Sequence, residues 1–167
     1  MKALTLHQPW ATLVARGIKQ VETRSWSTTY RGQLAIHASV RQPAIWWQEM
    51  VRDDPWCWML EHHCERVTRN KRSRVEWVGP LGAVVATCDL VDVVPVERCK
   101  IGDGSSGQTG WGYRPGNPVN PVICSDQLPY GDFGSGRYMW LLTNIEPLPT
   151  PILARGHQRL WNWDDEQ

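Results

Sequence analysis

Hydrophobic positions near the start of the chain alternate as in β-strands and then switch to a helical spacing. Residues 2–6 alternate weakly and predict a first strand, and residues 33–38 predict a stronger one. Between them, residues 8–17 predict a short helix, because Pro9 stands at its first turn and Gly17 follows its last turn in the left-handed cap position. The apolar face of this helix is expected to be buried, and it consists of Trp10, Leu13 and Val14.

The later part of the chain carries the longest apolar runs. Residues 82–96 give the strongest strand signal, since they are almost continuously apolar and rich in β-branched side chains. Asp89 and Asp92 interrupt this run and predict a bend or bulge in a curved strand. A further strand is predicted over residues 136–145, and the chain beyond it is expected to be broken by Pro147, Pro149 and Pro151.

Two stretches between these elements are predicted to be insertions. Residues 43–54 and 56–66 have helical spacing, and a basic connection follows over residues 67–75. Residues 102–121 hold six glycines and three prolines and predict a long irregular loop. Strands therefore dominate an expected α+β fold with short helices. We expect a single domain over residues 1–167, with insertions over about 40–80 and 98–136.

Composition narrows the class of protein. Apolar residues make up 41% and charged residues 21% of the 167 residues, which excludes a disordered or membrane composition. No apolar run approaches the ~20 residues that span a bilayer, and the first residues do not form a signal peptide. We therefore expect a cytoplasmic protein with no membrane partner, whose five cysteines are free thiols.

Charge and tryptophan are distributed unevenly. The net charge is +1, but residues 1–40 carry five basic residues and one acidic residue, a local basic face that can attract phosphates. The chain has eleven tryptophans and only one phenylalanine. The tryptophans either fill the core or line a groove in which bases stack. No metal or cofactor is expected, because paired CxxC spacing is missing from the group Cys57, His62, His63 and Cys64.

Several short motifs, taken together, resemble one known domain. They are His7-Gln8-Pro9-Trp10-Ala11, Gly17-Ile18-Lys19, Glu22-Thr23-Arg24-Ser25-Trp26, Tyr30-Arg31-Gly32 and Ile36-His37-Ala38-Ser39. This composite pattern resembles the ASCH domain, and the similarity resumes over residues 81–93, 138–147 and 156–161. The resemblance implies a PUA-like twisted β-barrel with RNA or DNA as the usual ligand class. The family that the chain resembles also includes a ribonuclease, and amidohydrolases whose substrate is acetylated cytidine. The fold therefore does not decide between binding and catalysis.

Three residues of the motif are candidates for chemistry. If the segment is extended, Glu22 and Arg24 point to one face, because side chains alternate with a period of two. They then either pair with each other, or Arg24 and Lys19 hold a phosphate while Glu22 orients a base edge or a water. A desolvated lysine can also act as a base, so Lys19 and Glu22 are the catalytic candidates of a hydrolase. The amidohydrolases resembled here have a threonine nucleophile in place of Glu22.

The remaining candidates surround this motif. Trp26 and Tyr30 are predicted on a polar loop, where aromatic side chains either stack on bases or cover the barrel. Arg31 either contacts phosphate or is solvated. His37 ends a strand and is either a hydrogen-bonded structural residue or a group that transfers protons. The predicted nucleic-acid-binding set is Lys19, Arg24, Trp26, Tyr30, Arg31, His37, Ser39 and Gln158.

Three functions remain open on this basis. The favoured one is a module that binds single-stranded RNA or DNA, or a modified base, in a basic cleft. The second is a hydrolase that acts on a modified nucleoside or on RNA. The third is a protein-interaction module that uses the tryptophan-rich insertions. The sequence leaves the oligomeric state open.

Overall fold

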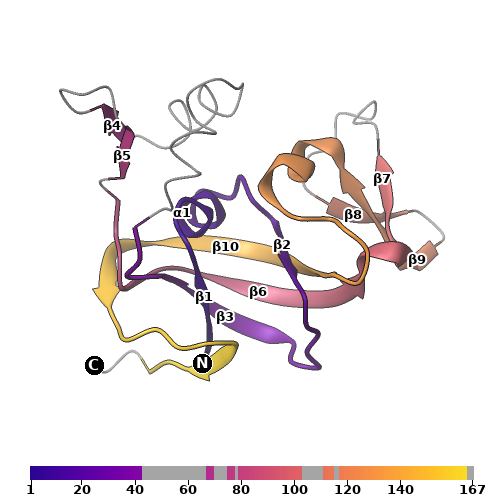
Figure 1. Ribbon diagram of the computed structural model, residues 1–167. Coiled ribbons are helices and arrows are strands. Elements are labelled where there is room, and N and C mark those ends of the chain that lie inside the picture. Colours follow the sequence, from indigo (N-terminus) through magenta and orange to yellow (C-terminus); the bar gives the residue numbers. More distant parts are fainter. Residues whose placement is uncertain (43–66, 70–74, 78, 103–110, 115–116, 165–167) are drawn as a thin grey trace.

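The computed structural model describes residues 1–42, 67–69, 75–77, 79–102, 111–114 and 117–164 (Figure 1). The helices predicted over 43–54 and 56–66 lie outside these residues. Within the described residues strands dominate, and the helices are α1 (Trp10–Ala15), η1 (Val96–Arg98) and η2 (Ser125–Tyr130). None of the described helices is long and apolar enough to cross a membrane. The predicted α+β class is confirmed.

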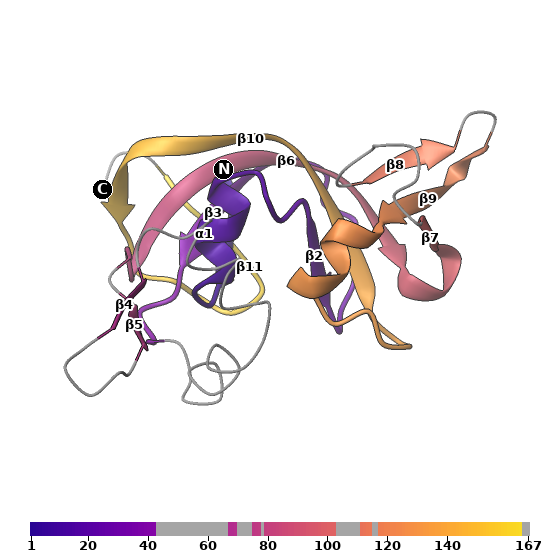
Figure 2. The same cartoon turned by 90° about the horizontal axis from the view of Figure 1, so that it is seen from above.

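A curled six-stranded sheet forms the body of the molecule. Its order is β11-β1-β3-β6-β10-β2. The strands are β1 (Lys2–Leu6), β2 (Val21–Arg24), β3 (Gly32–Ala38), β6 (Ala83–Pro95), β10 (Tyr138–Leu153) and β11 (Leu160–Asn162). β1 pairs in parallel with β3, and the other neighbouring strands pair antiparallel. Figure 2 shows β6 and β10 arching across the molecule with α1 on the hollow side, a curled half-barrel that is consistent with the expected twisted β-barrel.

The curvature of the sheet has a local cause in β6. Asp92 faces Leu141 and Leu90 faces Leu142, so Val91 is an extra residue in β6. A β-bulge of this kind bends the strand and increases its twist. The bulge predicted near Asp89 and Asp92 is therefore confirmed.

The expected break at the prolines after residue 145 is wrong, because β10 continues to Leu153. Pro147 still pairs with Ala86, and after a register shift the pairing resumes between Ile152 and Val84. Proline cannot donate to the ladder, and it is tolerated where the register is irregular. Because the register shifts, one long strand can contain prolines, although proline in a sequence usually predicts the end of a strand.

The helix α1 packs on the hollow side of the sheet. Leu13 and Val14 are fully buried, as predicted, while Trp10 is half-buried and packs against the core cluster that contains Val14. Gly17 follows the helix with a φ of 71°, the left-handed conformation that the sequence predicted. The chain turns back at that point, and the amides of Ile18 and Lys19 both donate to the Leu13 carbonyl, at 3.0 and 3.1 Å.

Two smaller sheets flank the main one (Figure 1). β4 (Val67–Arg69) pairs with β5 (Val75–Trp77), and β7 (Lys100–Gly102), β9 (Asn117–Cys124) and β8 (Trp111–Arg114) form the other. The irregular loop predicted over 102–121 is therefore wrong for the described residues. Trp111 donates from Nε1 to the Leu142 carbonyl at 3.0 Å, and Ile123 is fully buried, so this sheet is anchored to the main core.

Two leucines on one strand allow a matched test of the core. Leu142 is 0% exposed in the main core cluster, whereas Leu153 is 78% exposed near the end of β10. Leu142→Ala is expected to lower the free energy of unfolding by about 2–5 kcal/mol, because it leaves a cavity. Leu153→Ala is expected to change it by less than about 0.5 kcal/mol. Urea denaturation of both variants measures the difference, and equal losses would contradict the described core.

Candidate functional site

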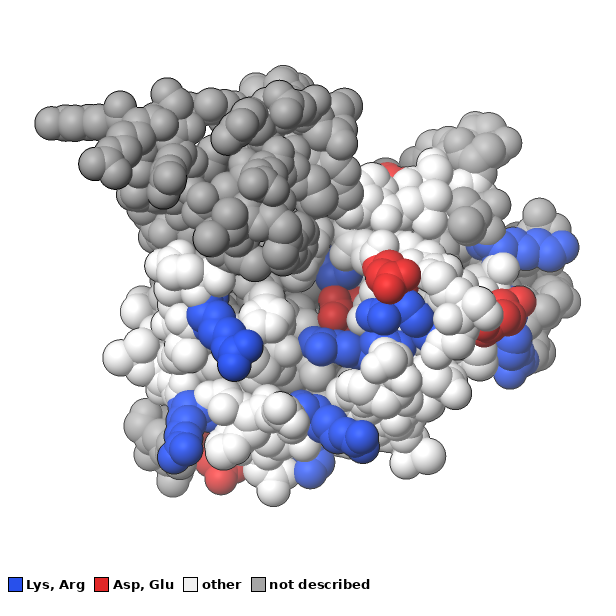
Figure 3. Space-filling model, in the orientation of Figure 1, with Lys and Arg blue, Asp and Glu red and all other residues white. Residues whose placement is uncertain are grey.

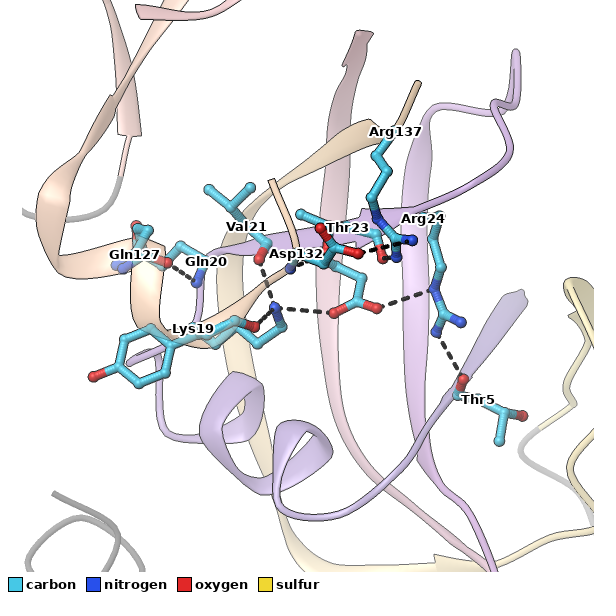
Figure 4. Close-up of polar contacts among 11 residues, drawn as sticks. Thr5, Lys19, Gln20, Val21, Thr23, Arg24, Gln127, Asp132 and Arg137 are labelled. Atoms are coloured by element: carbon cyan, nitrogen blue, oxygen red, sulfur yellow. Dashed lines mark hydrogen bonds and ion pairs between the residues drawn. The ribbon is translucent and has the colours of Figure 1, made fainter. Parts of the chain in front are cut away.

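Strand β2 places Glu22 and Arg24 on one face, as the alternation of side chains predicts. Arg24 Nε lies 3.0 Å from Glu22 Oε1, in an ion pair that lacks the alignment of a hydrogen bond. Arg24 Nη2 donates to the Thr5 carbonyl at 2.9 Å, which ties β2 to β1 across the hollow side (Figure 4). The predicted pairing of Glu22 with Arg24 is therefore what the structure shows.

Lys19 lies behind this pair and is 1% exposed. Its ammonium donates to the Val21 carbonyl at 2.8 Å and to the Tyr130 carbonyl at 2.5 Å, and lies 3.1 Å from Glu22 Oε2 (Figure 4). A lysine ammonium can donate three hydrogen bonds, and each of these three neighbours presents an acceptor oxygen. Burial lowers the pKa of Lys19, and the charge of Glu22 opposes that shift. In this arrangement Lys19 holds the fold together, and it would have to exchange contacts to reach a ligand.

Glu22, Thr23 and Arg24 border a hollow of about 400 Å³, called here the small hollow, whereas the predicted Lys19 does not line it. Its wall mixes both charges, since Arg137 Nη1 lies 3.2 Å from Asp132 Oδ2 and the Asp132 amide donates to Thr23 Oγ1 at 3.0 Å. Each described charge in this wall therefore has a neighbour of opposite sign. The lining residues are Trp10, Glu22, Thr23, Arg24, Pro129, Tyr130, Gly131, Asp132 and Arg137.

A second hollow, of about 650 Å³, has a different character and is called here the basic hollow. Among its described lining residues four are arginines, three are histidines, and none is aspartate or glutamate. Arg24 belongs to both hollows, which are therefore adjacent, and Figure 3 shows basic side chains around a hollowed middle of this face. The lining residues are Leu4, Thr5, His7, Arg24, Trp26, His37, Ser39, Val40, Arg41, Arg155, Gly156, His157, Gln158 and Arg159.

Burial and the positive charge of nearby arginines both lower the pKa of His7, which lines the basic hollow. Burial lowers this pKa first, and the charges of Arg41 and then Arg24 lower it further, against a small opposing effect of Glu22. A group that resists protonation because of neighbouring cations lies in a positive potential. The same potential attracts anions such as phosphate.

His37 forms part of the floor of the basic hollow. It is buried, and its Nε2 lies 3.0 Å from the Ala154 carbonyl, which can only accept, so Nε2 carries the hydrogen. Its Nδ1 has no partner among the described residues. Gly156 closes over the ring, because a Cβ at this position would lie 2.3 Å from His37 Cε1. The hydrogen bond to Ala154 supports the predicted structural role of His37. Its Nδ1, which has no partner among the described residues, can accept a hydrogen bond.

The structure brings some of the predicted binding residues together and separates others. Trp26, Ser39 and Gln158 line the basic hollow with Arg24 and His37. Tyr30 and Arg31 line neither hollow. The Tyr30 hydroxyl donates to the Gln33 carbonyl, and Arg31 Nη2 lies 2.7 Å from Asp92 Oδ1. These contacts hold the turn before β3, so both side chains serve local structure in this state.

Sequence reasoning missed five basic side chains of the hollow: His7, Arg41, Arg155, His157 and Arg159. The available signal was the density of charge in the closing motif, where three of residues 155–159 are arginine or histidine. That segment meets the ends of β1 and β3 because β10 pairs with β6 just before it and β11 pairs with β1 just after it. These pairings join distant parts of the chain, and they were not evident from local patterns.

The described residues contain no group of three or more histidine, cysteine, aspartate or glutamate side chains that could hold a metal ion. Cys57, His62, His63 and Cys64 lie outside the described residues. Cys88, Cys99 and Cys124 are free thiols, as predicted. Burial raises the pKa of Cys88 and of Cys99 to about 12, so neither forms a reactive thiolate near neutral pH.

Removing the buried lysine charge should destabilise the protein strongly. Lys19→Met leaves two carbonyls without their donor and a largely buried carboxylate with one cation fewer, which is expected to lower the free energy of unfolding by about 3–5 kcal/mol. The control is Arg31→Met in the more exposed Arg31–Asp92 pair, for which a loss below about 1 kcal/mol is expected. Chemical denaturation compares the two, and a small loss for Lys19→Met would show that the buried pair does not stabilise the fold.

Acid should destabilise the protein through His37. Burial lowers the pKa of His37 below its ordinary value of 6.5, so the unfolded chain binds a proton that the folded chain excludes. The free energy of unfolding must then fall as the pH drops below 6.5. His37→Gln is expected to reduce this slope between about pH 7 and pH 5, and His7, whose pKa is also lowered, supplies part of the remainder. An unchanged slope in denaturation curves of the variant would rule out this origin.

Comparison with known proteins places the chain in a family. The model of the ASCH domain matches residues 4–112, which is more than half of the chain. Activating signal cointegrator 1 of Homo sapiens is 56% identical over 97 residues, which cover 58% of this chain and 15% of the human protein. The Mus musculus protein of the same name is 56% identical over 41 residues, or 25% of this chain and 7% of the mouse protein. The chain thus spans only a small part of the length of these relatives. With its motifs in order on a curled β-sheet, the chain belongs to the ASCH domain family.

Proposed function

We propose that this protein binds single-stranded RNA or DNA in the basic hollow. The observation that carries the proposal is the composition of the described lining, with four arginines, three histidines and no carboxylate. Such a surface attracts a phosphate backbone even though the net charge of the chain is only +1. Membership of the ASCH family supports a nucleic-acid-related role at the level of the family.

The shape and chemistry of the hollow favour a single strand. Arg41, Arg155 and Arg159 are exposed, so their guanidinium groups can meet phosphate oxygens in pairs of hydrogen bonds. Trp26 supplies an aromatic face at the same place, and single-stranded binding combines a basic groove with aromatic platforms. Ser39 and Gln158 add polar groups that can meet base edges. A duplex would keep its bases away from a hollow of this size.

The small hollow supports a second candidate, a hydrolase acting on a modified nucleoside such as acetylated cytidine, or on RNA. Glu22 lines this hollow, and its carboxylate contacts Lys19, whose pKa burial lowers. A carboxylate beside a desolvated lysine is an arrangement that can take up a proton. Incubation with RNA and with acetylated cytidine, followed by separation of products, distinguishes turnover from binding alone.

The binding proposal predicts a charge-dependent loss at specific arginines. Fluorescence anisotropy with labelled single-stranded RNA and DNA at several salt concentrations compares the wild type with Arg41→Gln/Arg155→Gln. The double variant is expected to bind at least about tenfold more weakly. Its plot of log affinity against log salt is expected to be shallower by about 1.4, because two phosphate contacts are lost.

The matched control removes the same charge elsewhere. Arg98 and Lys100 are exposed and line neither hollow, so Arg98→Gln/Lys100→Gln is expected to keep the wild-type affinity and slope. Equal losses in the two double variants would show that only overall charge matters. The absence of binding to either strand by the wild type would reject the proposed function.

A further inference from the structure

The position of Trp26 in the basic hollow is fixed by the protein core. Its ring meets the ring of Trp140 edge to face, with centroids 4.7 Å apart and planes at 79°. Trp140 is fully buried, and its Nε1 donates to the Trp26 carbonyl at 3.4 Å. Trp26 itself is half-buried and lines the hollow. An aromatic ring that is held from behind and open toward a basic hollow is suited to serve as a platform for another planar group.

Arg159 lies over this ring. The centre of its guanidinium is 5.7 Å from the centroid of the Trp26 ring, within the range of a cation–π contact. The side chain is exposed, and Arg159 lines the same hollow. A guanidinium plane, like an aromatic ring, is a surface on which unstacked bases lie in complexes with single strands.

The backbone of Arg159 supports this placement. Its φ is 58°, in the left-handed region where residues other than glycine, asparagine and aspartate are uncommon. The next residue, Leu160, begins β11 and pairs with Leu4 of β1, so the sheet holds the backbone in this conformation. Strain of this kind often accompanies a functional position, and here an arginine stands where glycine would fit with less strain.

We propose that Trp26 and Arg159 form a stacking subsite for one nucleobase of a bound single strand. The proposal rests on the proposed function and adds which residues contact a base and how. In the structure the Arg159 guanidinium lies over the Trp26 ring. On binding, the guanidinium moves outward, the base lies against the Trp26 ring, and the guanidinium covers the other face of the base. Arg155, in the same hollow, contacts phosphate.

The subsite depends on the flat shape of the guanidinium as well as on its charge. A lysine at position 159 keeps the positive charge and imposes the same left-handed backbone, but it presents a compact ammonium instead of a plane. Arg159→Lys therefore removes stacking and retains attraction to phosphate. Arg155→Lys is the matched control, because it makes the same chemical change in the same hollow at a position that we assign to phosphate.

The test compares two probes of equal charge. One is a labelled oligothymidylate of about ten nucleotides, and the other is an abasic oligomer of the same length with the same sugar–phosphate backbone. Anisotropy titrations give the ratio of the two dissociation constants, which measures the contribution of the bases. The wild type is expected to prefer the base-containing strand by about tenfold, which corresponds to one stacked base. Arg159→Lys and Trp26→Leu are expected to reduce this ratio to about twofold or less, and Arg155→Lys is expected to preserve it.

Each outcome bears on one of the two proposals. If the wild type binds both probes with equal affinity, the stacking subsite is rejected while the binding function stands. The subsite is also rejected if Arg159→Lys and Arg155→Lys reduce the ratio to the same extent. If the wild type binds neither probe, the proposed function itself fails. Should Trp26→Leu not fold, the exposed Arg159→Lys variant still decides the matter, since it alters a side chain outside the core.

Discussion

A chain of charges that begins at the buried Lys19 joins four segments of the fold beside the two hollows. Lys19 contacts the carbonyls of Val21 and Tyr130 and the carboxylate of Glu22, and Glu22 in turn holds Arg24, which reaches the Thr5 carbonyl. These contacts connect the turn after α1, the edge strand β2, the end of η2 and the first strand. Burying a charged group away from water is costly unless a group of opposite charge or a hydrogen-bonding partner lies next to it. Each charged side chain in this series therefore needs its neighbour. Arg24, a member of this chain of charges, lines both the small hollow and the basic hollow.

The two hollows differ because they use the charges differently. In the small hollow, arginines meet carboxylates within the protein, as between Arg137 and Asp132. In the basic hollow, Arg41, Arg155 and Arg159 extend to solvent over a floor that His37 and Gly156 close tightly. A surface on which cations face solvent attracts anions. A surface whose cations are paired with carboxylates instead binds polar groups through hydrogen bonds of defined geometry. The two candidate functions, binding in the basic hollow and hydrolysis in the small hollow, are based on this difference.

Local patterns revealed the frame of the fold and part of the site. The strands over residues 2–6 and 32–38, the bulge near Asp92 and the left-handed Gly17 could be predicted, since each depends on a few neighbouring residues. The continuation of β10 through its prolines could not, because a register shift against β6 accommodates them. For the site, the motif indicated Arg24 and Trp26, whereas Arg155 and Arg159 enter it through the strand pairings on either side of their segment, β10 with β6 and β11 with β1. The burial of Lys19 likewise depends on Tyr130, more than a hundred residues later.

The pairing of β11 with β1 also affects the order of events in folding. It joins residues 2–4 with residues 160–162, a closure over nearly the whole chain that is entropically expensive and slow. Most of the main sheet, from β1 through β3 and β6 to β10 and β2, can pair before this closure, while Arg159, which directly precedes β11, reaches its place only with it. Molecules in which β11 has not docked would therefore keep much of the sheet and lack the assembled basic hollow. Because closure entropy grows only with the logarithm of length, the segments between these strands can vary greatly in size at little further thermodynamic penalty.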